Sequence, residues 1–144
     1  MFKKPTVWRA LACFALALLC LFCLLACNKV DATGSWEDAI YLKDTTLGKG
    51  EKTVTVKVAA DDQEITFTIR TDKDTLREVM EEHELISGED GPYGLYVQSV
   101  NGIRAVYEEG GYYWQITKNG EMLPTGVDSV TVADGEQYEF TKTK

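Results

Sequence analysis

Hydrophobic and polar residues alternate along much of the chain beyond residue 50, which is the pattern of half-buried strands. Residues 53–58 alternate Thr and Lys with Val, and residues 64–70 place Ile65, Phe67 and Ile69 on one face. The polar stretch 61–63 between them predicts a hairpin turn. The same pattern predicts later strands at 95–100, 103–107, 112–118, 130–132 and 137–141, with tight turns at Asn101-Gly102 and Asn119-Gly120.

One segment has a helical period instead. Thr75 and Glu78 stand three residues apart, the spacing at which their side chains cap a helix start reciprocally. Ser87-Gly88 is expected to end this helix, and residues 44–50 and 88–94 are expected to be loops. The apolar face of the helix is expected to hold Leu76, Val79, Met80, His83 and Ile86.

This order of elements, a hairpin followed by a helix and then several strands, predicts an α+β fold. We expect a β-grasp-like mixed sheet packed on one helix.

Residues 1–27 differ in composition from the rest of the chain. Lys3, Lys4 and Arg9 precede an uncharged run from residue 10 to residue 27, which is the layout of a signal peptide. The run ends in Leu24-Leu25-Ala26-Cys27, which resembles the bacterial lipobox. We therefore expect a signal peptide at 1–26, a lipid-modified Cys27 with a tether at 27–35, and a domain at 36–144. The two acyl chains of such an anchor hold a protein stably at the cell membrane.

An uncleaved transmembrane helix is the alternative for this segment, since 18 uncharged residues suffice to span a bilayer. Both interpretations put the domain on the extracytoplasmic side. All four cysteines lie in this segment, so no disulfide is expected in the domain.

The net charge of the chain limits the classes of partner that it is expected to bind. Three of the 15 Lys and Arg residues and none of the 23 Asp and Glu residues precede residue 28, so the remainder is more acidic than the whole chain at −8. Binding to nucleic acid needs a basic patch, and no segment supplies one. Nucleic acid is therefore excluded as an expected partner.

Catalytic chemistry finds little support in the sequence. His83 is the sole histidine, and no cysteine beyond residue 27 is present to share a metal with it. Glu89 and Asp90 lack the spacing of a calcium loop and are expected to be solvated. We expect no enzyme, no catalytic residue, no metal site and no required cofactor.

Aromatic residues are concentrated between residues 93 and 114, interleaved with glycines. Strand alternation would bury about half of them, and the rest would form an exposed aromatic edge suited to recognition. The alternative is that most of these rings belong to the core. The candidate ligand-binding residues are Tyr93, Gly94, Tyr96, Tyr113, Trp114 and Asn119.

Six segments beyond Trp36 carry a family pattern: 44–48, 67–72, 88–102, 113–114, 119–121 and 125–129. Through these segments the chain from Trp36 onward resembles the transcobalamin C-terminal-like domain family of bacterial lipoproteins. The resemblance implies a β-grasp-like ligand-binding domain with cobalamin as the candidate ligand. The chain departs from the family pattern at Gln115-Ile-Thr-Lys118 and at Met122-Leu-Pro124, where aromatic residues are common, so its stacking surface is thinner.

Two hypotheses for function follow. In the first, the domain binds a flat small molecule, such as a cobamide, and passes it to a transporter. In the second, it is a cell-surface module that binds a protein or a wall polymer through the same aromatic edge or through an open strand.

Overall fold

The computed structural model describes residues 33–144. The expected signal peptide, Cys27 and the tether up to residue 32 lie outside the described residues. No helix within 33–144 has the length and apolar character needed to cross a membrane.

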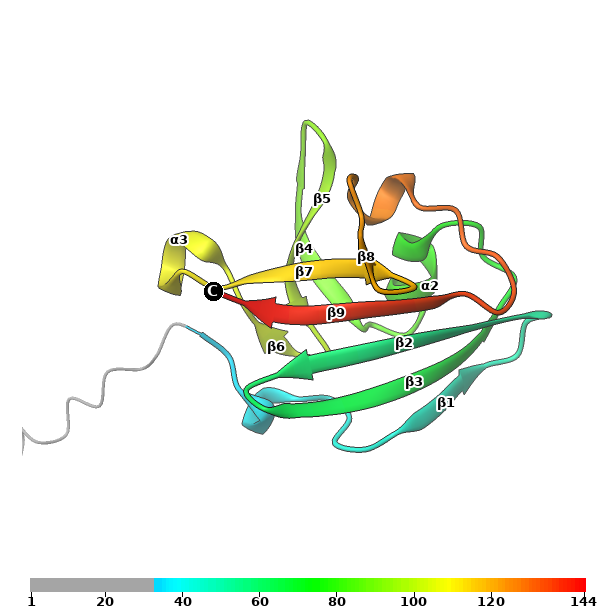
Figure 1. Cartoon of the computed structure of the whole chain (residues 1–144), viewed down its shortest axis with the longest axis horizontal. Helices are drawn as coiled ribbons and strands as arrows, with labels where there is room; N and C mark the ends of the chain where they lie inside the picture. Colours follow the sequence, from blue (N-terminus) through cyan, green and yellow to red (C-terminus); the bar gives the residue numbers. More distant parts are fainter. Residues whose placement is uncertain (1–32) are drawn as a thin grey trace, which may run out of the picture. The chain divides into compact units, whose positions relative to one another are not determined.

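Two β-sheets and two short α-helices make up the described part (Figure 1). The larger sheet is mixed, because the β1–β3 and β2–β9 pairs are parallel and its other pairs are antiparallel. Its strands, in spatial order, are β1 (Thr45–Gly48), β3 (Gln63–Thr71), β2 (Lys52–Ala60), β9 (Gln137–Thr143), β7 (Tyr113–Lys118) and β8 (Glu121–Met122). The smaller, antiparallel sheet contains β4 (Ile86–Gly91), β5 (Gly94–Val100) and β6 (Ile103–Arg104).

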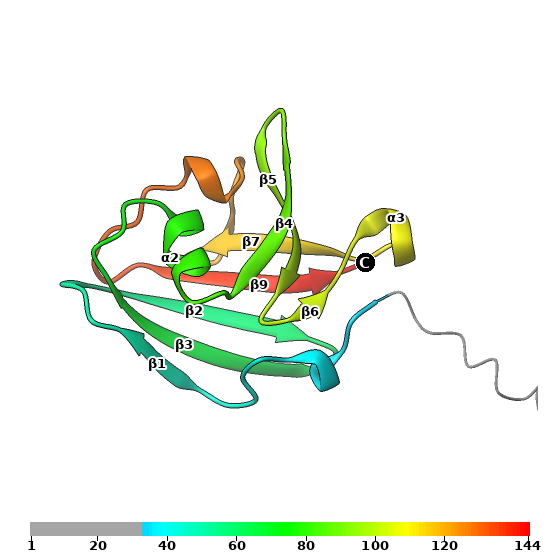
Figure 2. The same cartoon turned by 180° about the vertical axis from the view of Figure 1, so that it is seen from behind.

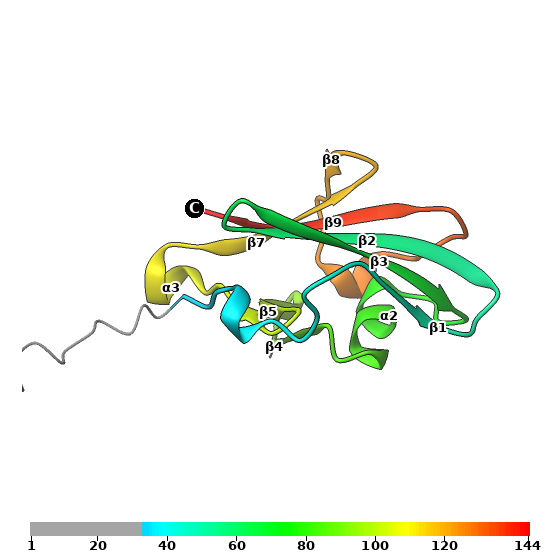
Figure 3. The ribbon, with the colours of Figure 1, turned by 90° about the horizontal axis from the view of Figure 1, so that it is seen from below.

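The elements form two layers, which Figure 3 shows edge-on. The large sheet is one layer, and the other contains helix α2 (Leu76–Glu82), the small sheet and the segment before β1. Helix α3 (Tyr107–Gly110) joins the small sheet to β7, and two 3-10 turns, η1 (Trp36–Asp38) and η2 (Val127–Ser129), complete the elements (Figure 2). The expected α+β class with a mixed sheet is confirmed, whereas the second sheet was not anticipated.

The β2–β3 hairpin confirms the pattern of alternation. Val54, Val56 and Val58 of β2 are buried and face the same side as Ile65, Phe67 and Ile69 of β3. The turn places Asp61 and Asp62 at positive φ, 48° and 65°. Such turns match the right-handed twist of the strands, which explains why local sequence predicted this hairpin well.

Helix α2 begins as expected but ends early. Thr75 and Glu78 form the predicted capping box, and Leu76, Val79 and Met80 are buried. The helix stops at Glu82, however, and Ile86 is the first residue of β4 rather than part of the helical face. Glu84 adopts a φ of +55°, which turns the backbone out of the helix.

Other predicted boundaries also need correction. The expected loop at 44–50 contains β1, and the expected loop at 88–94 is the outer part of the β4–β5 hairpin. The expected strand at 103–107 contains only β6, the following segment 108–111 lies largely in α3, and 130–132 makes a single bridge from Thr131 to Thr75. Among them, β1, β4 and β6 are edge strands of their sheets, and an edge strand with few buried residues shows no alternating pattern.

Candidate functional site

The β4–β5 hairpin runs across the direction of the large sheet's strands and projects from the body of the domain past β7 (Figures 1 and 2). Five of the six residues of β4 are exposed, so this strand is held mainly by its pairing with β5. Pro92 and Tyr93 form the turn, and the Tyr93 side chain is 96% exposed. The hairpin therefore presents an aromatic ring at its tip, fully open to solvent.

An ionic cluster lies next to this tip. Arg77 of α2 donates from Nη1 to Asp90 at 2.8 Å and to Asp128 at 2.6 Å, and from Nε to Glu81 at 2.8 Å. The second carboxylate oxygen of Asp128 accepts from the backbone N–H of Leu95 at 2.7 Å. The hydrogen bond from Arg77 is the main cause that lowers the pKa of Asp128, and the Leu95 N–H lowers it further.

Gly94, one of the expected ligand-binding residues, has a structural reason to be glycine. Its φ is +100°, and a Cβ atom there would stand 2.5 Å from Oδ2 of Asp128. Only glycine combines that backbone conformation with such a close approach. The residue thus lets Asp128 reach the hairpin.

Tyr96 and Tyr113 are both partly exposed, near α3. The Tyr96 side chain is 40% exposed, and its hydroxyl lies 3.3 Å from Glu108 Oε2 and 3.4 Å from the backbone nitrogen of Tyr107. Tyr107 was expected in a strand, but it begins α3 with its ring exposed. Tyr107 thus adds an exposed aromatic ring to this region that strand periodicity did not identify.

The remaining candidates lie elsewhere. Trp114 is only 7% exposed and packs in the core, and its Nε1 has no hydrogen-bond partner. Asn119 follows the other end of β7 and accepts a long 3.4 Å bond from the Gln137 backbone nitrogen. The six expected residues therefore do not form one surface, and Tyr93 is the most exposed of their side chains.

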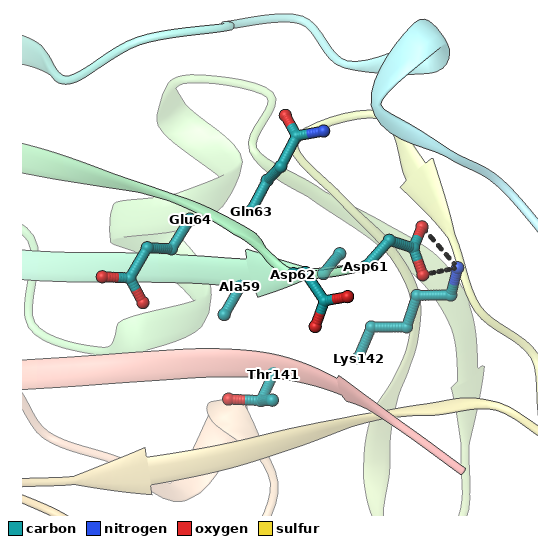
Figure 4. A pocket seen from close by; sticks show the side chains of 8 residues that line it. Ala59, Asp61, Asp62, Gln63, Glu64, Thr141 and Lys142 are labelled. Carbon is teal, nitrogen blue, oxygen red and sulfur yellow. Dashed lines mark hydrogen bonds and ion pairs between the residues drawn. The ribbon is translucent and has the colours of Figure 1, made fainter.

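A shallow pocket of about 410 Å³ opens at the β2–β3 turn, beside the end of β9 (Figure 4). Asp61 and Lys142 pair across it, with Nζ 3.1 Å from both carboxylate oxygens. Lys142 also donates to the carbonyl of Gly34 at 2.9 Å, and its side chain is only 5% exposed. The ammonium group of Lys142, which lines this pocket, is thus already bound by Asp61 and Gly34.

Residues 33–144 contain no group of three or more His, Cys, Asp or Glu side chains arranged to hold a metal ion. His83 caps α2, where its buried Nε2 has no hydrogen-bond partner and lies 3.9 Å from Glu82 Oε2. Asp90, expected to be solvated, is largely exposed and pairs with Arg77.

Two solved structures share the fold. A crystal structure from Ruminococcus gnavus, described as a "putative metal binding protein", is 38% identical with a TM-score of 0.62, and the match covers 65% of this chain and 98% of that one. Haptocorrin in complex with Cbi is 23% identical with a TM-score of 0.55, and the match covers 65% of this chain but only 25% of haptocorrin. The fold is therefore transcobalamin-like, as the sequence resemblance implied.

No curated protein matches the chain. A family model described as "Domain of unknown function (DUF4430)" matches residues 73–144, which is half of the chain and contains α2, the β4–β5 hairpin and β9. The chain belongs to this DUF4430 family.

Proposed function

We propose that this protein is a non-catalytic ligand-binding domain that a lipid on Cys27 anchors at the extracytoplasmic face of the cell membrane. The hairpin tip offers the Tyr93 ring to one face of a flat small molecule, with a corrinoid such as cobalamin as the first candidate. The observation that carries the proposal is the fully exposed Tyr93 ring at the end of a projecting hairpin. The fold shared with haptocorrin, solved in complex with Cbi, supports the choice of ligand class.

The expected binding is modest. A stacked aromatic contact contributes about 0.5–1.5 kcal/mol beyond the area that it buries. A domain that covers only one face of its ligand leaves the other face in water, and it must still offset the entropy lost on association. A partner that closes the second face, such as a membrane transporter, would raise the affinity.

Titration of the full-length protein in detergent micelles with cobalamin, followed by absorbance and calorimetry, tests the ligand. We expect saturable binding that Tyr93→Ala weakens. Tyr107→Ala is the matched control, because it removes another exposed tyrosine that lies on α3 rather than at the hairpin tip. Absence of binding up to millimolar cobalamin would refute the corrinoid proposal.

The second candidate function is a surface interaction module. β4 is an edge strand of the small sheet, and its residues after Ile86 are exposed, so its outer edge is open to pairing with an extended segment of another protein. Capture of a defined envelope protein by the wild-type chain, and its loss after replacement of Glu89 by Pro, would favour this function.

Anchoring is tested separately. We expect radiolabelled palmitate to be incorporated into the wild-type chain during expression, and Cys27→Ser to abolish both the label and the membrane association of the protein. Membrane association that persists in Cys27→Ser without any label would favour the uncleaved transmembrane helix instead.

A further inference from the structure

The outer half of the β4–β5 hairpin is anchored by burial on one strand only, because Leu95 and Val97 of β5 pack in the core while the facing residues of β4 are exposed. Along β4 only Ile86 is buried, and β6 pairs with β5 only at Ser99 and Val100, near the base. A register shift between Ser87 and Gly88 further separates the outer half of β4 from the base. A two-stranded hairpin of this kind is marginally stable in water by itself.

The Arg77 cluster holds both strands of this outer half at one point. Asp90 of β4 and Leu95 of β5 are directly paired across the hairpin, next to the Gly91–Gly94 pair that closes the turn. Arg77 binds Asp90 directly, and it binds Leu95 through Asp128, whose two oxygens receive Arg77 and the Leu95 N–H. A single guanidinium thus fixes the Asp90–Leu95 pair, which only the Gly91–Gly94 pair separates from the turn that carries Tyr93.

The cluster is itself attached to rigid structure. Arg77 lies in the first turn of α2, whose neighbours Leu76 and Val79 are fully buried. The segment that carries Asp128 is joined to the start of the same helix, since Leu76 donates to the Val130 carbonyl at 2.9 Å. The hairpin tip is therefore tied to the helix through Arg77, in addition to the burial of Leu95 and Val97 on β5.

We infer that Arg77 is a positioning residue, which holds the β4–β5 hairpin in the orientation that presents Tyr93 to a ligand. For its ligand, this inference rests on the proposed function. A planar guanidinium supplies several donors in a fixed arrangement, so it joins three carboxylates at once. A lysine ammonium at the same place keeps the charge but loses this geometry.

Hydrogen–deuterium exchange of the full-length protein in detergent micelles measures the positioning directly. We expect Arg77→Met to speed the exchange of peptides within 88–96 by about tenfold, with β2 unchanged and Arg77→Lys intermediate. Arg104→Met is the matched control, because Arg104 forms a comparable pair with Glu109 at 2.8 and 2.6 Å, and its side chain is linked to the hairpin only through the charge of Glu89, with no hydrogen bond to residues 88–96. Equal exchange of 88–96 in the Arg77→Met and Arg104→Met variants would overturn the inference.

A substitution at Asp90 tests the same cluster in case Arg77→Met fails to fold. Asp90 is mostly exposed, so Asp90→Ala removes one arm of the cluster without endangering the core. Unchanged exchange of 88–96 in Asp90→Ala would count against the inference even if Arg77→Met unfolds.

Affinity gives the second measurement. Because a mobile tip must be ordered on binding, we expect Arg77→Met to raise the Kd for cobalamin about tenfold while Arg104→Met does not. An unchanged Kd in Arg77→Met would overturn the ligand-presenting role of Arg77. If the wild-type protein does not bind cobalamin, the proposed ligand fails, whereas the exchange data still decide whether Arg77 positions the hairpin.

Discussion

Asn101 offers a sharp test of how this domain holds its N-terminal segment. Its side chain is fully buried, and it pairs with the Tyr41 backbone like a neighbouring strand. Oδ1 accepts from the Tyr41 N–H, and Nδ2 donates to the Tyr41 carbonyl, both at 2.9 Å. Asn101 also occupies the first position of a tight turn with φ at +51°.

Replacing Asn101 by Ala removes both hydrogen bonds and keeps an unfavourable φ. A buried backbone group left without a partner costs about 1–3 kcal/mol, and a left-handed conformation costs a non-glycine residue about 1 kcal/mol more. Because Tyr41 is only partly buried, water recovers part of the loss. We expect Asn101→Ala to lower the free energy of unfolding by about 3–4 kcal/mol.

Urea unfolding followed by tryptophan fluorescence measures this change. With a slope of about 2 kcal/mol per molar, the midpoint should fall by about 1.5–2 M. Asn119→Ala is the matched control, since Asn119 also precedes a glycine, has a φ of +50°, and makes only a 3.4 Å side-chain bond. It should cost about 1 kcal/mol. Equal losses in the two variants would show that the Tyr41 pairing contributes nothing.

Three further predictions concern other contacts. The pKa values of Asp128 and Glu78 are lowered in the folded protein, so the stability that these two carboxylates contribute should be present above about pH 4 and should decline as the pH falls further. Asp128→Asn should therefore flatten the acid side of a plot of the unfolding midpoint against pH. Trp36→Phe removes the 2.7 Å hydrogen bond from Nε1 to the Ala60 carbonyl, and in urea titrations it should lower the free energy of unfolding by about 1–3 kcal/mol. A change below about 0.5 kcal/mol, which is the usual scatter of surface substitutions, would contradict this. Gly94→Ala should speed hydrogen exchange at the hairpin tip, because its Cβ would displace Asp128, and unchanged exchange would refute this.

The parts of the fold that local sequence predicted are those that local physics determines. The β2–β3 hairpin follows from alternation and its turn, and the start of α2 follows from the cap formed by Thr75 and Glu78. Strand β5 matches the expected strand at 95–100, but β4 was missed because its residues after Ile86 are polar and exposed, and because Gly88 lies against the Tyr96 backbone in a way that no local pattern reveals.

The candidate site was predictable only in part. The concentration of aromatic residues drew attention to Tyr93 and Tyr96, which the structure places on the hairpin with exposed rings. It could not separate them from Trp114, whose burial depends on packing between layers. The contact between Arg77 and Asp128 joins residues 51 positions apart, and sequence periodicity carries no signal for such a pair.

The place of β9 in the large sheet has a consequence for biosynthesis. This strand lies between β2 and β7, yet it is the last strand of the described part to be translated. The nascent chain therefore cannot complete the large sheet until residues 137–143 have emerged from the ribosome. A protein that is threaded through a translocon in an extended state would benefit from this delay, because premature folding in the cytoplasm would block its passage.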